Sequence, residues 1–161
     1  MGFLTALSAC TTPRAVHTIT LADLETAPPA RTQRLGRTVV CDADAIKPLC
    51  TPLGSRLGLL EIRSQREWQS LVRAASSSGP CPNLQNGIVI GIVSWAGLPV
   101  DGRWPIELDS IQLRDGGGLV NATFQPGTYL PDGTTYLETA YVEGLQAVLA
   151  VNVNGTTFYP D

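Results

Sequence analysis

The run Gly87-Ile88-Val89-Ile90-Gly91-Ile92-Val93-Ser94-Trp95 decides the fold of this chain of 161 residues. Apart from Gly91, every position from Ile88 to Val93 is isoleucine or valine, which are β-branched residues that favour extended backbone. A short, continuous apolar run is typical of a strand that is buried on both faces. We therefore predict that residues 87–95 form a central strand of a sheet.

The residues before this run predict a strand followed by a helix. Leu57 to Arg63 alternates and is rich in leucine and isoleucine, which predicts the strand. Ser64 and Glu67 then fit a capping box, which marks the start of a helix. The helix is predicted to end near Ala75, and the apolar residues that recur at helical spacing along its core face are Trp68, Leu71 and Val72.

The residues after the run predict further strands joined by tight turns. Alternating or apolar segments lie at residues 104–114, 119–124, 136–141 and 146–153. Asp115-Gly116 and Asn154-Gly155 predict hairpin turns, the second leading into a last strand after residue 155. Together with the helix, these segments predict an α+β fold, a mainly antiparallel β-sheet with one main helix packed on it.

The first residues of the chain predict a lipid anchor. Leu7-Ser8-Ala9-Cys10 follows a short apolar run and resembles the lipobox of bacterial lipoproteins, in which a signal peptide is removed before a cysteine that then carries diacylglycerol. A secretory signal also needs a basic segment, and no lysine or arginine precedes Cys10. Residues 1–10 are therefore either the remnant of a signal peptide that starts upstream or an ordinary N-terminus. We adopt the first interpretation, which predicts lipidation of Cys10 and an extracytoplasmic, membrane-anchored location.

Composition divides the rest of the chain into a lead-in and one domain. Residues 11–34 contain the stiff break Ala27-Pro28-Pro29-Ala30 and predict a tether, and residues 35–161 predict a single α+β domain. The net charge is −3, and the acidic groups concentrate toward the C-terminus. Because nucleic-acid binding needs a basic face, we expect no nucleic acid among the partners.

The cysteines permit one disulfide. With Cys10 assigned to lipid, an oxidising compartment would allow Cys50 to pair with Cys81 or Cys41 to pair with Cys50, and the sequence does not choose between these pairings.

Residues able to support catalysis are few. His17 is the only histidine and lies in the lead-in, so a Ser-His-Asp triad would need that segment to fold over the domain. The only lysine, Lys47, precedes a proline in a loop-like segment, and Glu107 and Asp109 fit the solvated face of a strand. Asp42-Ala43-Asp44 begins like a calcium loop but lacks the glycine and the glutamate of that motif. We expect no catalytic residue, no metal and no cofactor, and a small hydrolase with an unrecognised site stays an alternative.

Two loops are candidates for partner binding. Trp95 and Trp104 flank a loop with two glycines and a proline, and tryptophan and arginine are enriched where one protein surface binds another. We predict that Trp95, Arg103 and Trp104 contact a partner. A second candidate is the loop Gln125 to Thr135, which is rich in glycine and proline.

Several of these motifs occur together in one known family. The strand and helix around Ser64-Gln65-Arg66-Glu67-Trp68 precede the apolar strand, then Gly102-Arg103-Trp104 and the strand Ile106-Glu107-Leu108. In this order, residues 55–153 resemble the PrcB C-terminal-like domain of bacterial secreted and lipid-anchored proteins, with Gly102-Arg103-Trp104 where that family has Gly-Gly-Tyr. The resemblance implies a small α+β or mainly β domain without catalytic residues. The family takes its name from a protein of a surface protease complex, which implies protein binding.

The sequence thus predicts an extracytoplasmic lipoprotein domain that is not an enzyme and that binds or assembles on a cell-envelope or secreted protein. The alternative within the binding class is an accessory or inhibitory subunit of a surface protease, docked by strand addition at a free sheet edge.

Overall fold

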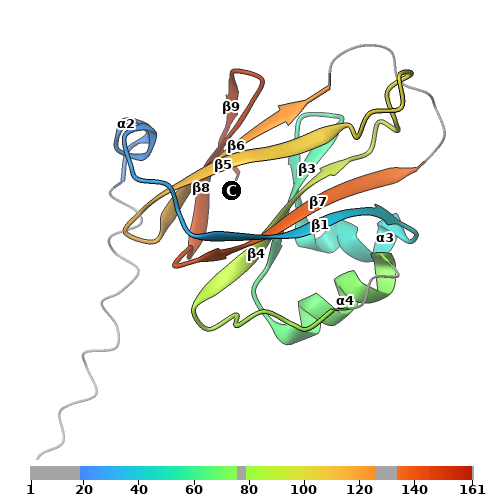
Figure 1. Cartoon of the computed structure of the whole chain (residues 1–161), viewed down its shortest axis with the longest axis horizontal. Helices are drawn as coiled ribbons and strands as arrows, with labels where there is room; N and C mark the ends of the chain where they lie inside the picture. The colour runs from blue at the N-terminus through green and yellow to red at the C-terminus, as the bar shows by residue number, and fades with distance from the viewer. Residues whose placement is uncertain (1–18, 76–78, 126–133, 161) are drawn as a thin grey trace, which may run out of the picture.

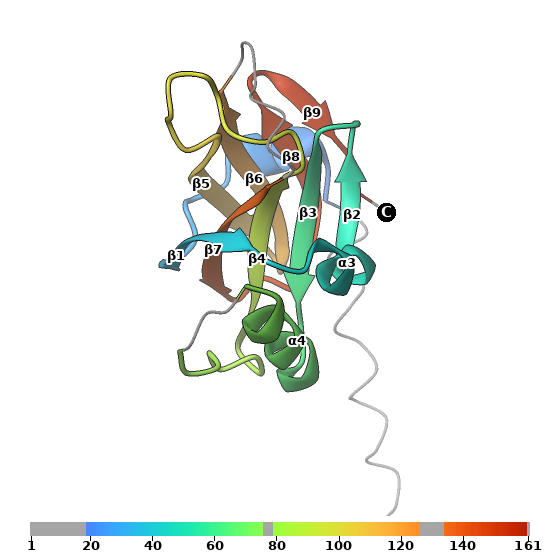
Figure 2. The same cartoon turned by 90° about the vertical axis from the view of Figure 1, so that its right-hand side faces the viewer.

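Two β-sheets packed face to face form the centre of the molecule (Figure 1). The computed structural model describes residues 19–75, 79–125 and 134–160. Figure 2 shows the strands of the larger sheet in front of those of the smaller one. A mainly antiparallel β structure with few helices is therefore confirmed, and the strands divide between two sheets where the sequence predicted one.

The larger sheet has five antiparallel strands in the order β1-β7-β4-β3-β2. Its strands are β1 (Thr32–Val40), β2 (Cys50–Leu53), β3 (Leu57–Ile62), β4 (Gly87–Ser94) and β7 (Thr135–Glu143). The central position predicted for the apolar run is confirmed, because β4 is the middle strand and all of its residues are buried. β1 and β2 are the two edge strands.

The smaller sheet has four strands in the order β5-β6-β8-β9. They are β5 (Ile106–Arg114), β6 (Gly117–Phe124), β8 (Ala147–Val153) and β9 (Thr156–Phe158), and only the β6–β8 pair is parallel. Both predicted hairpin turns are confirmed. Asp115 and Gly116 have φ angles of 50° and 84°, and Asn154 and Gly155 have φ angles of 53° and 88°, the positive values that a type I′ turn requires.

The two faces of the larger sheet pack against different layers. Ile88, Ile90 and Ile92 of β4 face the smaller sheet, in a core that includes Val120 of β6 and Val151 of β8. The alternate residues of β4 belong to a second core on the outer face of the sheet, beneath the helices. Because successive side chains of a strand point to opposite faces, one apolar run supplies both cores.

The predicted helix is confirmed as α4 (Gln65–Ala75), which packs on the outer face of the larger sheet. Ser64 Oγ accepts a hydrogen bond from the Glu67 N–H at 3.2 Å, as in a capping box. The Glu67 carboxylate accepts from the N–H of Arg63 at 2.8 Å, one residue before the position that the motif specifies. Two short elements, α3 (Ala43–Ile46) and the 3₁₀ helix η2 (Lys47–Leu49), join β1 to β2 beside it.

Residues 19–34 fold onto the domain, which differs from the predicted tether. α2 (Leu21–Glu25) covers the outer face of the smaller sheet, where Leu24 packs with Leu119 and Ala150. β1 then begins at Thr32. A helix of five residues is too short to show an apolar period in the sequence, so its formation depends on this packing and on its cap.

A bulge in β5 changes the face of its second half. The register with β6 shifts between Leu108 and Ser110, so Asp109 is an extra residue in the strand. Glu107 and Asp109 are exposed as predicted, and Asp109 accepts a hydrogen bond from Thr123 at 2.7 Å. The bulge turns Ile111 into the core, whereas uninterrupted alternation would have placed Ser110 there.

Candidate functional site

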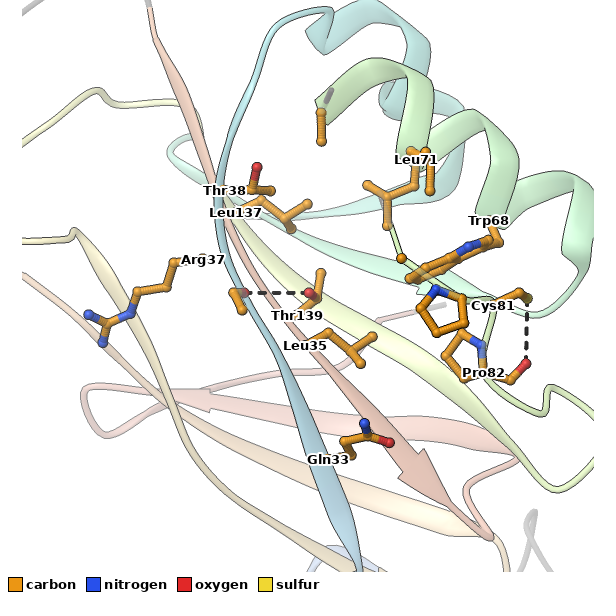
Figure 3. Close-up of a pocket in the computed structure, with 15 residues that line it drawn as sticks. Gln33, Leu35, Arg37, Thr38, Trp68, Leu71, Cys81, Pro82, Leu137 and Thr139 are labelled. Carbon is orange, nitrogen blue, oxygen red and sulfur yellow. Dashed lines mark hydrogen bonds between the residues drawn. The ribbon is translucent and has the colours of Figure 1, made fainter. Parts of the chain in front are cut away.

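A groove lies on the outer face of the larger sheet, between α4 and the edge strand β1 (Figure 3). Its volume is about 370 Å³, within the range of pockets that hold ligands. β1 and β7 contribute one side of its lining, and α4 with residues 79–82 contributes the other. The apolar side chains in this lining are Leu35, Trp68, Leu71, Val72, Ala75, Pro80, Pro82 and Leu137.

The polar groups of the groove are mostly uncharged. They include the amide of Gln33, the hydroxyls of Thr38 and Thr139, and the thiol of Cys81. Arg37 also borders the groove, but Figure 3 shows its side chain on the far side of β1, pointing away from Trp68. Among the described residues that line the groove there is no carboxylate and no imidazole. Such a lining offers apolar contact and a few hydrogen bonds.

Trp68 lies between this groove and a second, more open hollow. The second hollow has a volume of about 440 Å³ and is lined by Trp68, Val72 and Cys81 together with polar residues of α4, namely Gln65, Gln69 and Arg73. Trp68 is half-buried and lines both spaces, so both lie within reach of its indole. The sequence predicted that Trp68 packs in the core. In the structure, part of its indole is also accessible from the groove and from the second hollow.

Two attachments hold the helix and the following segment over the sheet. The N–H groups of Cys41 and Asp42, just after β1, donate to the carbonyl of Ala74 in the last turn of α4, at 2.7 and 3.1 Å. Tyr141 Oη of β7 donates to the carbonyl of Asn83 at 2.7 Å. The C-terminal end of α4 is therefore attached to the residues that follow β1, and the segment after α4 is attached to β7.

A bulge gives β1 two chemically different faces. The register with β7 shifts between Arg34 and Gly36, and Gly36 has a φ of 129°, a value that L side chains rarely adopt. Arg34 and Arg37 consequently lie on one face of the strand although they are three positions apart. Leu35 and Thr38 lie on the other face and line the groove. β1 is thus uncharged toward the groove and basic on its opposite side.

The basic face of β1 is built around one buried carboxylate. Glu138 of β7 is only 4% exposed, and its Oε1 lies 3.4 Å from Arg34 Nη1 and 3.3 Å from Arg37 Nε. Its Oε2 accepts a hydrogen bond from the N–H of Leu108 in β5 at 2.5 Å, and Arg34 Nη2 donates to the carbonyl of Leu108 at 2.6 Å. These bonds join the two sheets along one side of the molecule.

The neighbouring edges of the two sheets, β5 and β1, differ in whether another segment is hydrogen-bonded to them. The edge of β5 is covered beyond Leu108, because Ala30 N donates to the Ile111 carbonyl at 2.8 Å and Leu113 N donates to the Pro28 carbonyl at 3.1 Å. β1 keeps its place as the edge strand of the larger sheet, and most of its residues are exposed. An uncovered edge presents backbone N–H and C=O groups on which another strand can pair.

Neither predicted disulfide is present. Cys50 and Cys81 are free thiols, so Cys50 is bonded neither to Cys81 nor to Cys41. The thiol of Cys50 packs in the core beneath the helices, whereas Cys81 follows α4, lines the groove and donates to the Pro82 carbonyl at 3.4 Å. Burial raises the pKa of the Cys50 thiol to about 12, so this thiol is inert at neutral pH. Cys10 lies outside the described residues, and its predicted lipidation stays a prediction.

The three predicted partner-binding residues have different surroundings. Trp95 is half-buried in the core beneath the helices. Trp104 packs edge to face on Tyr136, with ring centroids 5.0 Å apart, and its buried Nε1–H has no hydrogen-bond partner in the described part of the chain. Arg103 is exposed and pairs with Asp101 at 3.1 Å. The second predicted loop, Gln125 to Thr135, lies mostly outside the described residues.

The acidic and basic residues considered for chemistry have local structural partners. Asp42 caps α3 by accepting from the N–H of Ala45 at 3.3 Å, and Asp44 pairs with Lys47 at 3.2 Å. No group of three or more histidine, cysteine or acidic side chains that could hold a metal occurs within residues 19–75, 79–125 and 134–160. His17 lies outside these ranges.

Sequence reasoning did not find the groove. Its lining comes from three segments that meet only in the folded chain, namely β1, α4 with the residues after it, and β7. The partial signal was the helical face carrying Trp68 and Leu71, which the sequence explained by core packing alone.

No protein-family model, curated protein or solved structure matches the chain. The resemblance of residues 55–153 to PrcB C-terminal-like domains therefore stays a prediction from its motifs. Within the described residues, no helix has the length and apolar character needed to cross a bilayer.

Proposed function

We propose that the protein is a non-catalytic binding domain of the bacterial cell envelope, anchored through lipid at Cys10. Its groove between α4 and β1 would hold a segment of an envelope or secreted protein. The groove itself carries the proposal, because it combines an apolar lining, the exposed part of Trp68 and a few uncharged polar groups. Sites that bind rather than transform a ligand need no positioned acid, base or nucleophile, and the described lining supplies apolar contact in their place.

The dimensions of the groove favour a peptide segment over a broad globular surface. A volume of about 370 Å³ accommodates a few side chains at a time. Because the second hollow also borders Trp68, two side chains of one bound peptide could contact the indole, one from each hollow. Tryptophan is one of the residues enriched among the energetic anchors of protein interfaces.

A surface protease is the second candidate for the partner. The uncovered edge of β1 favours it, because strand addition at a sheet edge is a common way for one protein to hold an extended segment of another. The loop with Trp95, Arg103 and Trp104 stays a competing contact surface, because Arg103 is exposed there.

Selection of displayed random peptides on the full chain tests the groove. We expect selected peptides to lose about tenfold or more of their affinity with Trp68→Ala, because the anchor is removed. Tyr159→Ala is the matched control, since it removes an exposed aromatic side chain that does not line the groove. Peptides that bind the Trp68→Ala variant as well as the wild type would contradict the proposal, as would the recovery of no binding peptide.

Two further assays test whether the protein is an enzyme and whether it is anchored to a membrane. Peptidase or esterase turnover that a single Ser or Glu substitution abolishes would replace the binding proposal with the hydrolase alternative. For the location, the chain expressed with its natural upstream sequence should partition with membranes, and Cys10→Ser should release it, whereas Cys41→Ser should not. Equal partitioning of both variants would contradict lipidation at Cys10.

A further inference from the structure

We infer that the segment held by this protein binds as an added strand along β1 and that it alternates apolar with acidic side chains. This inference rests on the proposed function, because it names the chemistry and the geometry of the occupant of the same groove. It is carried by the backbone of an edge strand and by the contrast between the two faces of that strand.

The backbone of β1 is arranged for pairing on its outer side. β1 spans nine residues and pairs with β7 along one edge. The carbonyl of Arg31 accepts from the N–H of Glu143 at 3.1 Å, so the backbone groups of Arg31 and Gln33 turn toward β7. The groups of Thr32 and Arg34 then turn outward, where an added strand would meet them.

The faces of β1 determine which side chains an added strand can carry. Side chains of a strand alternate between two faces, so every second residue of the occupant would lie over the groove, near Leu35 and Trp68. The residues between them would lie beside Arg34 and Arg37, whose side chains stay 56% and 46% exposed although both contact Glu138. One buried carboxylate faces two guanidinium groups, which leaves a net positive charge for an acidic residue to pair with.

The same charges disfavour a second copy of the chain as the occupant. Pairing of β1 with β1 of another copy would bring Arg34 and Arg37 of both chains together, and like charges across an interface are costly. Within the part of the chain that the structure describes, β2 and β9 are also edge strands, but they are less suited to a long added strand. β2 has four residues including Pro52, and β9 has three.

Titration of the full chain with synthetic peptides tests the inference. The probes are short acetylated peptides of alternating leucine and aspartate and of alternating leucine and lysine. We expect the aspartate peptide to bind about tenfold or more tightly than the lysine peptide, because only aspartate complements the basic face of β1. Arg37→Gln should weaken the aspartate peptide several-fold, while Arg114→Gln, at an exposed arginine that ends β5 and lines neither hollow, should not.

Backbone methylation of the aspartate peptide separates strand addition from side-chain contact. N-methylation of one alternate set of amides should abolish binding, because those N–H groups pair with β1, and methylation of the other set should be tolerated. Equal affinity of the two peptides, or tolerance of both methylation patterns, would overturn the inference. If display still selects peptides whose binding requires Trp68, the proposed function stands and only binding by strand addition is wrong. Formation of dimers through β1 in place of peptide binding would also overturn it.

Discussion

The two faces of the five-stranded sheet carry similar residues but are covered to different extents. Toward the smaller sheet, β4 presents Ile88, Ile90 and Ile92, each at most 5% exposed. On the outer face, α4 covers Val89 and Val93 of the same strand but leaves a groove over β1 and β7. A helix is about 10 Å wide, whereas strands lie about 4.8 Å apart, so α4 and the short helices beside it leave part of the five-stranded sheet uncovered by described residues.

The inner face of the larger sheet packs against the smaller sheet and contributes buried apolar area to stability. The part of the outer face over β1 and β7 leaves apolar surface accessible beside an edge strand. Substitutions on the two faces and at the elements around them test this difference.

Ile90→Ala should cost the most stability. Ile90 is fully buried between the sheets, and truncation of such a side chain costs about 2–5 kcal/mol. Leu35→Ala, at the groove, should cost about 1 kcal/mol, since Leu35 is only half-buried. Urea denaturation of both variants measures the difference, and equal losses of unfolding free energy would remove the contrast between the faces.

Glu138→Gln should lower the free energy of unfolding by about 1–3 kcal/mol, because the charge that holds Arg34 and Arg37 is lost. Glu107→Gln is the matched control, since Glu107 is exposed and a surface change of this kind stays within about 0.5 kcal/mol. Thermal or urea denaturation measures the stability of both variants. If Glu138→Gln is as stable as Glu107→Gln, the buried carboxylate does not stabilise the contact between the sheets.

Cys50 should make stability depend on pH in the alkaline range. Burial raises its pKa from the ordinary 9.0 to about 12, so above pH 9 the unfolded chain releases this proton while the folded chain keeps it. Stability should therefore fall as the pH rises from about 9 toward 12, and less steeply in Cys50→Ala. Identical pH profiles for the wild type and Cys50→Ala would contradict the burial of this thiol.

Thr20→Ala should have the smallest effect, about 1 kcal/mol, because it removes the cap of α2. Hydrogen bonds from the backbone and the hydroxyl of Thr20 lower the pKa of Asp23, so their contribution is present above the ordinary value of 3.8 and is lost as the pH falls through the folded pKa. Acid denaturation of Thr20→Ala should show less of this loss than that of Glu25→Gln in the same helix. Equal acid sensitivity would argue against the cap.

Local patterns in the sequence predicted the elements that depend on few residues. The apolar run of β4, the capped helix α4 and the turns at Asp115-Gly116 and Asn154-Gly155 were all confirmed, because periodicity, a cap and positive φ angles are encoded locally. The division of the strands into two sheets was not predicted, because it depends on which strands pair in the folded chain. α2 was also missed, because its five residues are held by Leu119 and Ala150 of distant strands.

The candidate site was predictable only in part. Trp68 and Leu71 were recognised as one helix face, but the sequence could not show that β1 would leave part of that face uncovered. The bulge at Gly36, which puts Arg34 and Arg37 on one side, has no short-range signal beyond a glycine in a strand. The expected pairings of Cys50 failed because its thiol is directed into the core beneath the helices.

Hydrogen–deuterium exchange of the full chain, with and without the alternating leucine–aspartate peptide, shows whether the outer face over β1 and β7 is the binding surface. We expect slower exchange of amides in β1 and α4 when the peptide is present, with the loop from Trp95 to Trp104 unchanged. Protection confined to that loop, or no protection in β1, would contradict this expectation.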